Sequence, residues 1–137
     1  MADDGLQNDD LQNDSLRDHG GGDGGRHDGG IRMILVLTTF PDRERAREAA
    51  GLLLDERLAA CVSVLPPVES HYVWEGERRC EEEVPVLIKT VAERYPRLEE
   101  RLRERHPYAV PEIVAVPVAR GLPAYLEWVA QQSGAGL

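Results

Sequence analysis

A chain of 137 residues, 42% of them hydrophobic and with a formal net charge of −9, suits a single acidic globular domain. The negative charge argues against general nucleic-acid binding, which needs a basic face, and against binding to anionic membranes. Because no apolar run is long enough to span a bilayer and the N-terminus lacks the apolar core of a signal peptide, we expect a cytoplasmic protein.

Residues 1–31 form an acidic, Gly- and Asp-rich tail that precedes the folded part of the chain. Eight Asp against two Arg give this segment −6 of the total charge of −9. It cannot bury enough apolar surface to offset chain entropy, so we expect it to be disordered, with one domain over residues 32–137. His19 and His27 suit at most weak metal binding, and a solvated linker explains them as well. Met33 is an alternative start, because the folded pattern begins there.

The first half of the domain is predicted as strand, helix, strand and strand. Met33–Leu37 is a continuous apolar run, typical of a strand buried on both faces. Pro41 and Asp42 begin a helix, with the Asp carboxylate near the positive end of the helix dipole. Ala59–Leu65 predicts a second strand, which two prolines end because proline cannot donate to a ladder. Extended structure resumes from Val68 to Trp74.

The second half is predicted as turn, strand, helix, strand and helix. Residues 75–77 are read as a turn, and Val84–Thr90 as the next strand. Tyr95-Pro96 begins a helix, since proline suits the first helical turn. A strand over Glu112–Val118 and a short helix after Pro123 complete the pattern.

This order of elements, β-α-β-β-α-β plus a C-terminal helix, predicts an α+β, ferredoxin-like two-layer sandwich with the helices on one face of the sheet. Three of the strands, at residues 33–37, 86–88 and 113–118, are apolar on both faces. One chain has helices to cover only one of these faces, so a partner should cover the other. We therefore predict an obligate homo-oligomer.

The segment from His106 to Glu112 is the first candidate for a functional site. A residue before proline avoids the α region, so the helix should end at His106 and a strand should open at Glu112. This corner would hold an imidazole, the phenol of Tyr108 and a carboxylate between two regular elements. A helix-ending His, a packed Tyr and a solvated Glu explain the same residues, so both interpretations stay open.

Lys89 is the only lysine in the chain and lies late in an apolar strand. An unpaired buried ammonium is costly, so Lys89 either pairs with a carboxylate, with Glu112 as its natural partner, or binds a ligand. Tyr72 and Trp74 are amphipathic aromatics that suit an interface or a ligand site.

The two cysteines make neither a disulfide framework nor a CxxC metal motif. We interpret Cys61 as a buried apolar residue and Cys80 as exposed and incidental. Glu81–Glu83 are interpreted as a solvated acidic patch ahead of a strand.

Five motifs in register resemble the CutA divalent-cation-tolerance family, over about residues 33 to 132. They are Leu58-Ala59-Ala60-Cys61-Val62, Tyr72-Val73-Trp74-Glu75-Gly76, Leu87-Ile88-Lys89-Thr90, His106-Pro107-Tyr108 with Pro111-Glu112, and Tyr125-Leu126-Glu127-Trp128. The resemblance implies a ferredoxin-like subunit, a tight homotrimer, cytoplasmic location and a link to divalent-metal tolerance. It implies no established enzymatic activity, and copper binding is proposed for some members.

The copper site of those members transfers to this sequence only in part. The resemblance aligns its cysteine with Thr38 and its two adjacent histidines with Arg105 and His106. His106 is therefore the remaining metal ligand and Glu112 a second candidate, for Cu(II) or another divalent cation. One imidazole cannot hold copper tightly, but trimer symmetry can bring in ligands from neighbouring chains.

Three kinds of function stay open. The first is a non-enzymatic trimer that binds a divalent metal or a small ligand at clefts between subunits, lined by Lys89, Tyr108, Tyr72 and Trp74. The second is a scaffold or interaction protein, or a small-ligand sensor like the trimeric PII-type signalling proteins. The third is an enzyme, which the lack of a glycine-rich phosphate cradle and of a recognisable catalytic triad in the folded region disfavours.

Overall fold

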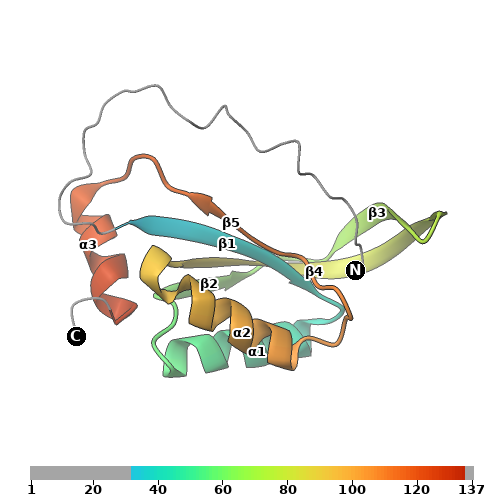
Figure 1. The fold of residues 1–137 in the computed structure, drawn as a ribbon, viewed down its shortest axis with the longest axis horizontal. Helices are drawn as coiled ribbons and strands as arrows, with labels where there is room; N and C mark the ends of the chain where they lie inside the picture. The colour runs from blue at the N-terminus through green and yellow to red at the C-terminus, as the bar shows by residue number, and fades with distance from the viewer. Residues whose placement is uncertain (1–31, 135–137) are drawn as a thin grey trace.

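The computed structural model describes residues 32–134, which fold as an α+β domain on a five-stranded antiparallel sheet (Figure 1). The predicted tail, residues 1–31, lies outside the described residues. The elements in chain order are β1 Met33–Phe40, α1 Arg43–Asp55, β2 Cys61–Val64, β3 Val68–Trp74, β4 Glu77–Val91, the 3₁₀ helix η4 Ala92–Arg94, α2 Tyr95–Arg105, β5 Ile113–Pro117 and α3 Pro123–Gln132.

The sheet has the strand order β2-β4-β1-β5, and β3 pairs with the outer part of β4 as a hairpin that extends beyond the helices (Figure 1). β1 is central and pairs antiparallel with both β4 and β5. This topology confirms the predicted ferredoxin-like arrangement. Asp42 is the N-cap of α1, where its carboxylate accepts the N–H of Arg45 at 2.8 Å, so the predicted helix start is confirmed.

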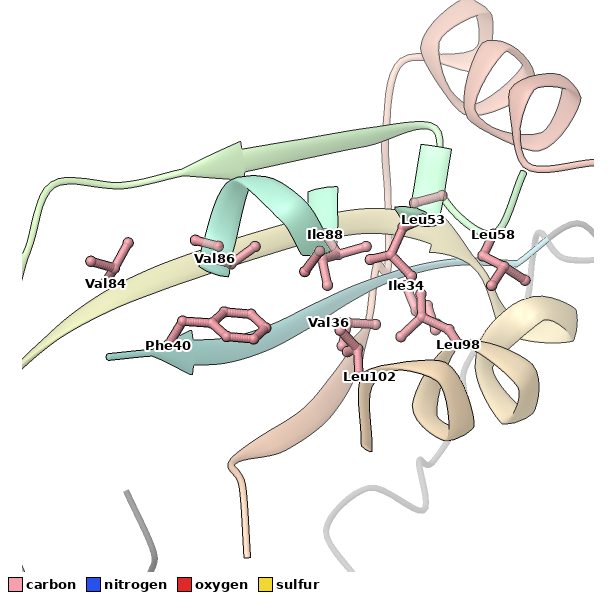
Figure 2. Packing of buried hydrophobic residues seen from close by; sticks show 13 residues of the cluster. Ile34, Val36, Phe40, Leu53, Leu58, Val84, Val86, Ile88, Leu98 and Leu102 are labelled. Carbon is pink, nitrogen blue, oxygen red and sulfur yellow. The ribbon is translucent and has the colours of Figure 1, made fainter. Parts of the chain in front are cut away.

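The main core lies between the sheet and helices α1 and α2 (Figure 2). Alternate residues of the strands face these helices, because successive side chains of a strand point to opposite faces. Each large apolar side chain that is fully buried contributes about 1.5–3 kcal/mol to stability. The larger members of this core are Ile34, Val36, Phe40, Leu53, Leu58, Val84, Val86, Ile88, Leu98 and Leu102.

The opposite face of the sheet is only partly covered. Val129 and Ala130 of α3 pack on Met33 and Val91 at one end of this face. The prediction that the helices share one face of the sheet is thus confirmed for α1 and α2 and wrong for α3. The apolar residues of α3 cover one end of the opposite face.

An apolar strip on that opposite face remains uncovered in the single chain. The pairing of β1 with β5 aligns Leu37 with Val114 and Leu35 with Val116, so these four side chains share a face. Leu37, Val114 and Val116 are 37%, 47% and 42% exposed. The predicted uncovered apolar face is therefore present, and we refer to these three residues as the open sheet face.

Strand β4 is longer than predicted, because it begins at Glu77 and not at Val84. Glu75 and Gly76 alone form the connection to β3, with φ values of 52° and 80°. A two-residue hairpin turn with positive φ at both positions extends the ladder of both strands. The interpretation of Glu81–Glu83 as a solvated patch is consequently wrong for Glu83, which lies within β4 and is fully buried.

Candidate functional site

The segment between α2 and β5 turns as the prolines predict. α2 ends at Arg105, and His106 is extended, with φ −84° and ψ 135°. β5 begins at Ile113, one residue after the predicted start at Glu112. The segment thus brings His106 and Tyr108 to the end of β1.

The imidazole of His106 is held by two backbone groups. Its Nε2 donates to the carbonyl oxygen of Thr39 at 2.7 Å, and its Nδ1 accepts the N–H of Tyr108 at 3.3 Å. A carbonyl can only accept and an amide N–H can only donate, so these contacts assign a neutral ring with its proton on Nε2. The ring also stacks on Phe40 with centroids 4.5 Å apart. Burial lowers the pKa of His106, while the bond to Thr39 partly opposes this.

The phenol of Tyr108 points to the buried carboxylate of Glu83. Its hydroxyl donates to Oε2 of Glu83 at 3.1 Å, and the Thr39 hydroxyl donates to the same oxygen at 3.4 Å. Burial, followed by the charge of Glu83, raises the pKa of Tyr108. Two hydroxyl donors therefore meet one carboxylate at the end of β1.

A second phenol–carboxylate pair lies next to the first. Tyr72 of β3 donates its hydroxyl to Oε1 of Glu81 at 2.8 Å, and burial followed by this bond raises the pKa of Tyr72. Glu81 and Glu83 are two residues apart in β4 and so share a face of the strand. Continuing the β1–β5 register by one residue aligns the half-buried Glu112 with Thr39.

We call this group the polar cluster. It joins four of the predicted site residues with three that the sequence interpretation did not select. Its members are Thr39, Tyr72, Glu81, Glu83, His106, Tyr108 and Glu112.

Of the two other predicted site residues, Lys89 lies away from the polar cluster, whereas Trp74 lies two residues from Tyr72 on the same face of β3. Lys89 pairs with Leu35 of β1 and Cys61 of β2, six residues along β4 from Glu83, which is about 20 Å in an extended strand. Trp74 ends β3 beside the hairpin turn. The structure does not bring Lys89 to its predicted partner Glu112, because β1 lies between their strands. Lys89 and Val116 both pair with Leu35 of β1, and Glu112 lies four residues before Val116.

A separate group of metal-ligating side chains lies on the β3–β4 hairpin. Ligand atoms of Glu69, His71 and Cys80 lie within 4.8 Å of one another, and all three residues are exposed. Sequence interpretation missed this group, although a two-residue turn at Glu75-Gly76 already pairs position 71 with position 80. Both cysteines have free thiols, with Cys61 half-buried where a buried residue was predicted, and Cys80 exposed as predicted.

None of the helices in residues 32–134 is long and apolar enough to cross a membrane.

Comparison with known proteins gives one consistent family. A model of the CutA1 divalent ion tolerance proteins matches residues 34–132. The "Divalent-cation tolerance protein CutA" of Thermus thermophilus is 46% identical over 100 residues, which cover 73% of this chain and 97% of that protein. The mouse "Protein CutA" is 43% identical over 93 residues, 68% of this chain, but only 52% of its own length is matched.

Solved structures agree. The Cut A1 structure from Thermus thermophilus superposes with a TM-score of 0.72 at 45% identity, covering 73% of this chain and 97% of that one. A structure described as the "Periplasmic divalent cation tolerance protein CutA" from Archaeoglobus fulgidus superposes with a TM-score of 0.71 at 32% identity, covering 74% and 98%. The match spans both the sheet and the corner at His106, and the chain therefore belongs to the CutA1 divalent ion tolerance family.

Proposed function

We propose that this chain forms a cytoplasmic homotrimer that acts in divalent-metal tolerance and catalyses no reaction. It would bind copper or another divalent cation at clefts between subunits. The observation that carries the proposal is that the polar cluster lies at the end of the open sheet face, where a second subunit would dock.

The open sheet face supports the assembly. Leu37, Val114 and Val116 are exposed together, and the exposed Tyr125 and Trp128 add aromatic surface from α3. Clustered apolar side chains of this kind mark protein–protein contacts in soluble proteins. A closed ring of three copies would cover the face without leaving an open end. The family resemblance favours the trimer over other closed assemblies.

The carboxylates of the polar cluster support cation binding. Glu83 accepts a hydrogen bond from Tyr108, whose ring centroid lies 4.9 Å from that of His106, and Glu81 and Glu112 are further carboxylates of the polar cluster. We propose His106 and Glu112 as metal ligands. Both nitrogens of His106 already have hydrogen-bond partners, so a metal ion must displace one, and the 3.3 Å bond from Tyr108 N–H is the weaker.

A second candidate function is a trimer that senses a small ligand. It is favoured because both nitrogens of His106 are already hydrogen-bonded, which disfavours metal binding there. Two phenols, Tyr72 and Tyr108, are held beside carboxylates and can exchange those bonds for bonds to a ligand. Lys89 and Trp74 would then contribute from the same sheet or from a neighbouring subunit.

Native mass spectrometry of the tag-free full chain, titrated with Cu(II), separates these functions. We expect a trimer with a small, saturable number of copper ions, and the loss of one copper ion per subunit, but not of the trimer, in His106→Ala. His27→Ala is the matched control, because it removes a histidine outside the domain and should leave copper uptake unchanged. A trimer that takes up no copper, or takes it up without saturation, contradicts the metal site and favours the ligand sensor. A monomer contradicts both.

A further inference from the structure

The β3–β4 hairpin carries a group of side chains that the proposed function does not use. His71 of β3 pairs directly with Cys80 of β4, and Glu69 is two residues before His71 on the same face. The Nε2 atom of His71 lies 3.0 Å from Oε1 of Glu69 and 3.7 Å from Sγ of Cys80. One nitrogen, one sulfur and one carboxylate oxygen therefore converge on one point at the surface.

The two separations from His71 Nε2 are close to the edges of a tetrahedral metal site. Zn²⁺ binds nitrogen and oxygen at about 2.0–2.1 Å and sulfur at about 2.3 Å, which places tetrahedral N and S ligands about 3.5 Å apart and N and O ligands about 3.4 Å apart. The observed N–S and N–O separations, 3.7 and 3.0 Å, differ from these by a few tenths of an ångström. Side chains that are 68% and 73% exposed, as in His71 and Glu69, can adjust by that much.

The charges also suit a divalent ion. A neutral imidazole, a thiolate and a carboxylate together carry two negative charges, which balance Zn²⁺. Glu82 pairs with Glu69 across the hairpin, so its exposed side chain lies on the same face of the hairpin. Of the two arginines in this part of β4, Arg78 lies on the same face as the three ligands. Arg79 lies on the other face, where its guanidinium is 3.9 Å from the carboxylate of Glu77.

We propose that Glu69, His71 and Cys80 form a binding site for a borderline divalent cation of the Zn²⁺ type, with Glu82 or water as the fourth ligand. The mixed N, S and O ligand set distinguishes it from the oxygen-rich polar cluster. Strand alternation also separates the two, because Tyr72 and Glu81 lie on the opposite face of the same hairpin. The site is therefore independent of His106 and of the proposed function.

Cobalt(II) is the probe for this site, because it replaces Zn²⁺ and absorbs visible light. The test uses the reduced full chain with Cys61→Ser, in which Cys80 is the only thiol. We expect one thiolate-bound Co(II) per chain, with a thiolate-to-cobalt charge-transfer band and the intense visible bands of tetrahedral cobalt. These bands should disappear when Zn(II) is added. Cys80→Ser in this background should abolish the charge-transfer band, and His71→Ala should weaken Co(II) binding at least about tenfold.

Two matched controls keep the test decisive. His106→Ala and His27→Ala each remove another imidazole and should leave the thiolate-to-cobalt charge-transfer band unchanged. All the substituted hairpin residues are exposed, so circular dichroism should show an intact fold. The absence of a charge-transfer band in the Cys61→Ser protein overturns the proposal, as does a band that survives Cys80→Ser or unchanged affinity in His71→Ala. A site lost in His106→Ala would assign the metal to the polar cluster instead.

Discussion

The charge state of His106 is set by its two backbone neighbours. Protonation would place a second N–H on Nδ1, against the N–H of Tyr108, and would charge a ring that is stacked on the buried Phe40. Both effects favour the neutral ring in the folded protein. A residue that sequence reasoning selected as a metal ligand thus also ties α2 to the end of β1.

This arrangement predicts a pH dependence of stability. Burial holds the folded pKa of His106 below the value of about 6.5 in the unfolded chain, so the unfolded chain takes up the proton first as the pH falls. The stabilisation by the neutral ring is complete above about pH 6.5 and is lost as the pH falls toward the folded pKa. We expect the free energy of unfolding in urea to fall more steeply between about pH 8 and pH 5 in the wild type than in His106→Gln. Equal slopes in the two proteins would contradict a buried, neutral His106.

At the scale of elements, the β3–β4 hairpin decides where several side chains lie. Its two-residue turn pairs Val68 with Glu83 and Trp74 with Glu77, and so extends β4 by seven residues before Val84. Glu75 adopts a φ of 52°, in the left-handed region that residues with a Cβ rarely occupy. The turn is therefore formed at a conformational cost.

Replacing Glu75 by Asn should lower this cost. Asn tolerates the left-handed region better than Glu, and Asn-Gly is the preferred sequence of such turns. We expect Glu75→Asn to raise the free energy of unfolding by about 0.5–1 kcal/mol, measured by urea denaturation. Glu75→Ala is the control, because it removes the same charge and keeps the strain. Equal gains in both variants would show that charge, not backbone conformation, is responsible.

At the scale of the whole molecule, the open sheet face is an apolar surface that the single chain leaves exposed to water. α1 and α2 cover one side of the sheet, and α3 covers only an end of the other. The rows Leu35–Val116 and Leu37–Val114 continue the apolar pattern of the core onto this uncovered side. Assembly would bury these rows.

A charge placed in this face should therefore break the assembly. If the proposed trimer forms through this face, we expect Val116→Glu to shift the protein to monomer in sedimentation velocity, because an unpaired carboxylate would be buried at the contact. Leu54→Glu is the matched control: Leu54 is 45% exposed and Val116 is 42% exposed, but Leu54 lies on α1, away from the open face. Dissociation in both variants, or in neither, would place the contact elsewhere.

Sequence alone determined the order of elements, the corner at His106 and the apolar character of both sheet faces. These depend on periodicity and on prolines, which act over a few residues. The sequence did not determine which sheet face the C-terminal helix covers or how long β4 is, because a terminal helix can pack on either face and a run of charged residues resembles a loop. Pro96 and Pro107, in contrast, determine both ends of α2. Pro96 favours the first helical turn, and Pro107 disfavours the helical conformation at His106.

Only the tertiary structure decided which polar side chains meet. The sequence suggests a solvated Glu83, yet the structure buries it and directs the hydroxyls of Tyr108 and Thr39, from distant segments, to its carboxylate. Lys89 and Glu112 look like partners, yet β1 lies between their strands. His71 and Cys80 meet only through hairpin register. The physical reason is the same in each case: local sequence sets backbone conformation, whereas contacts between distant residues depend on strand order and register.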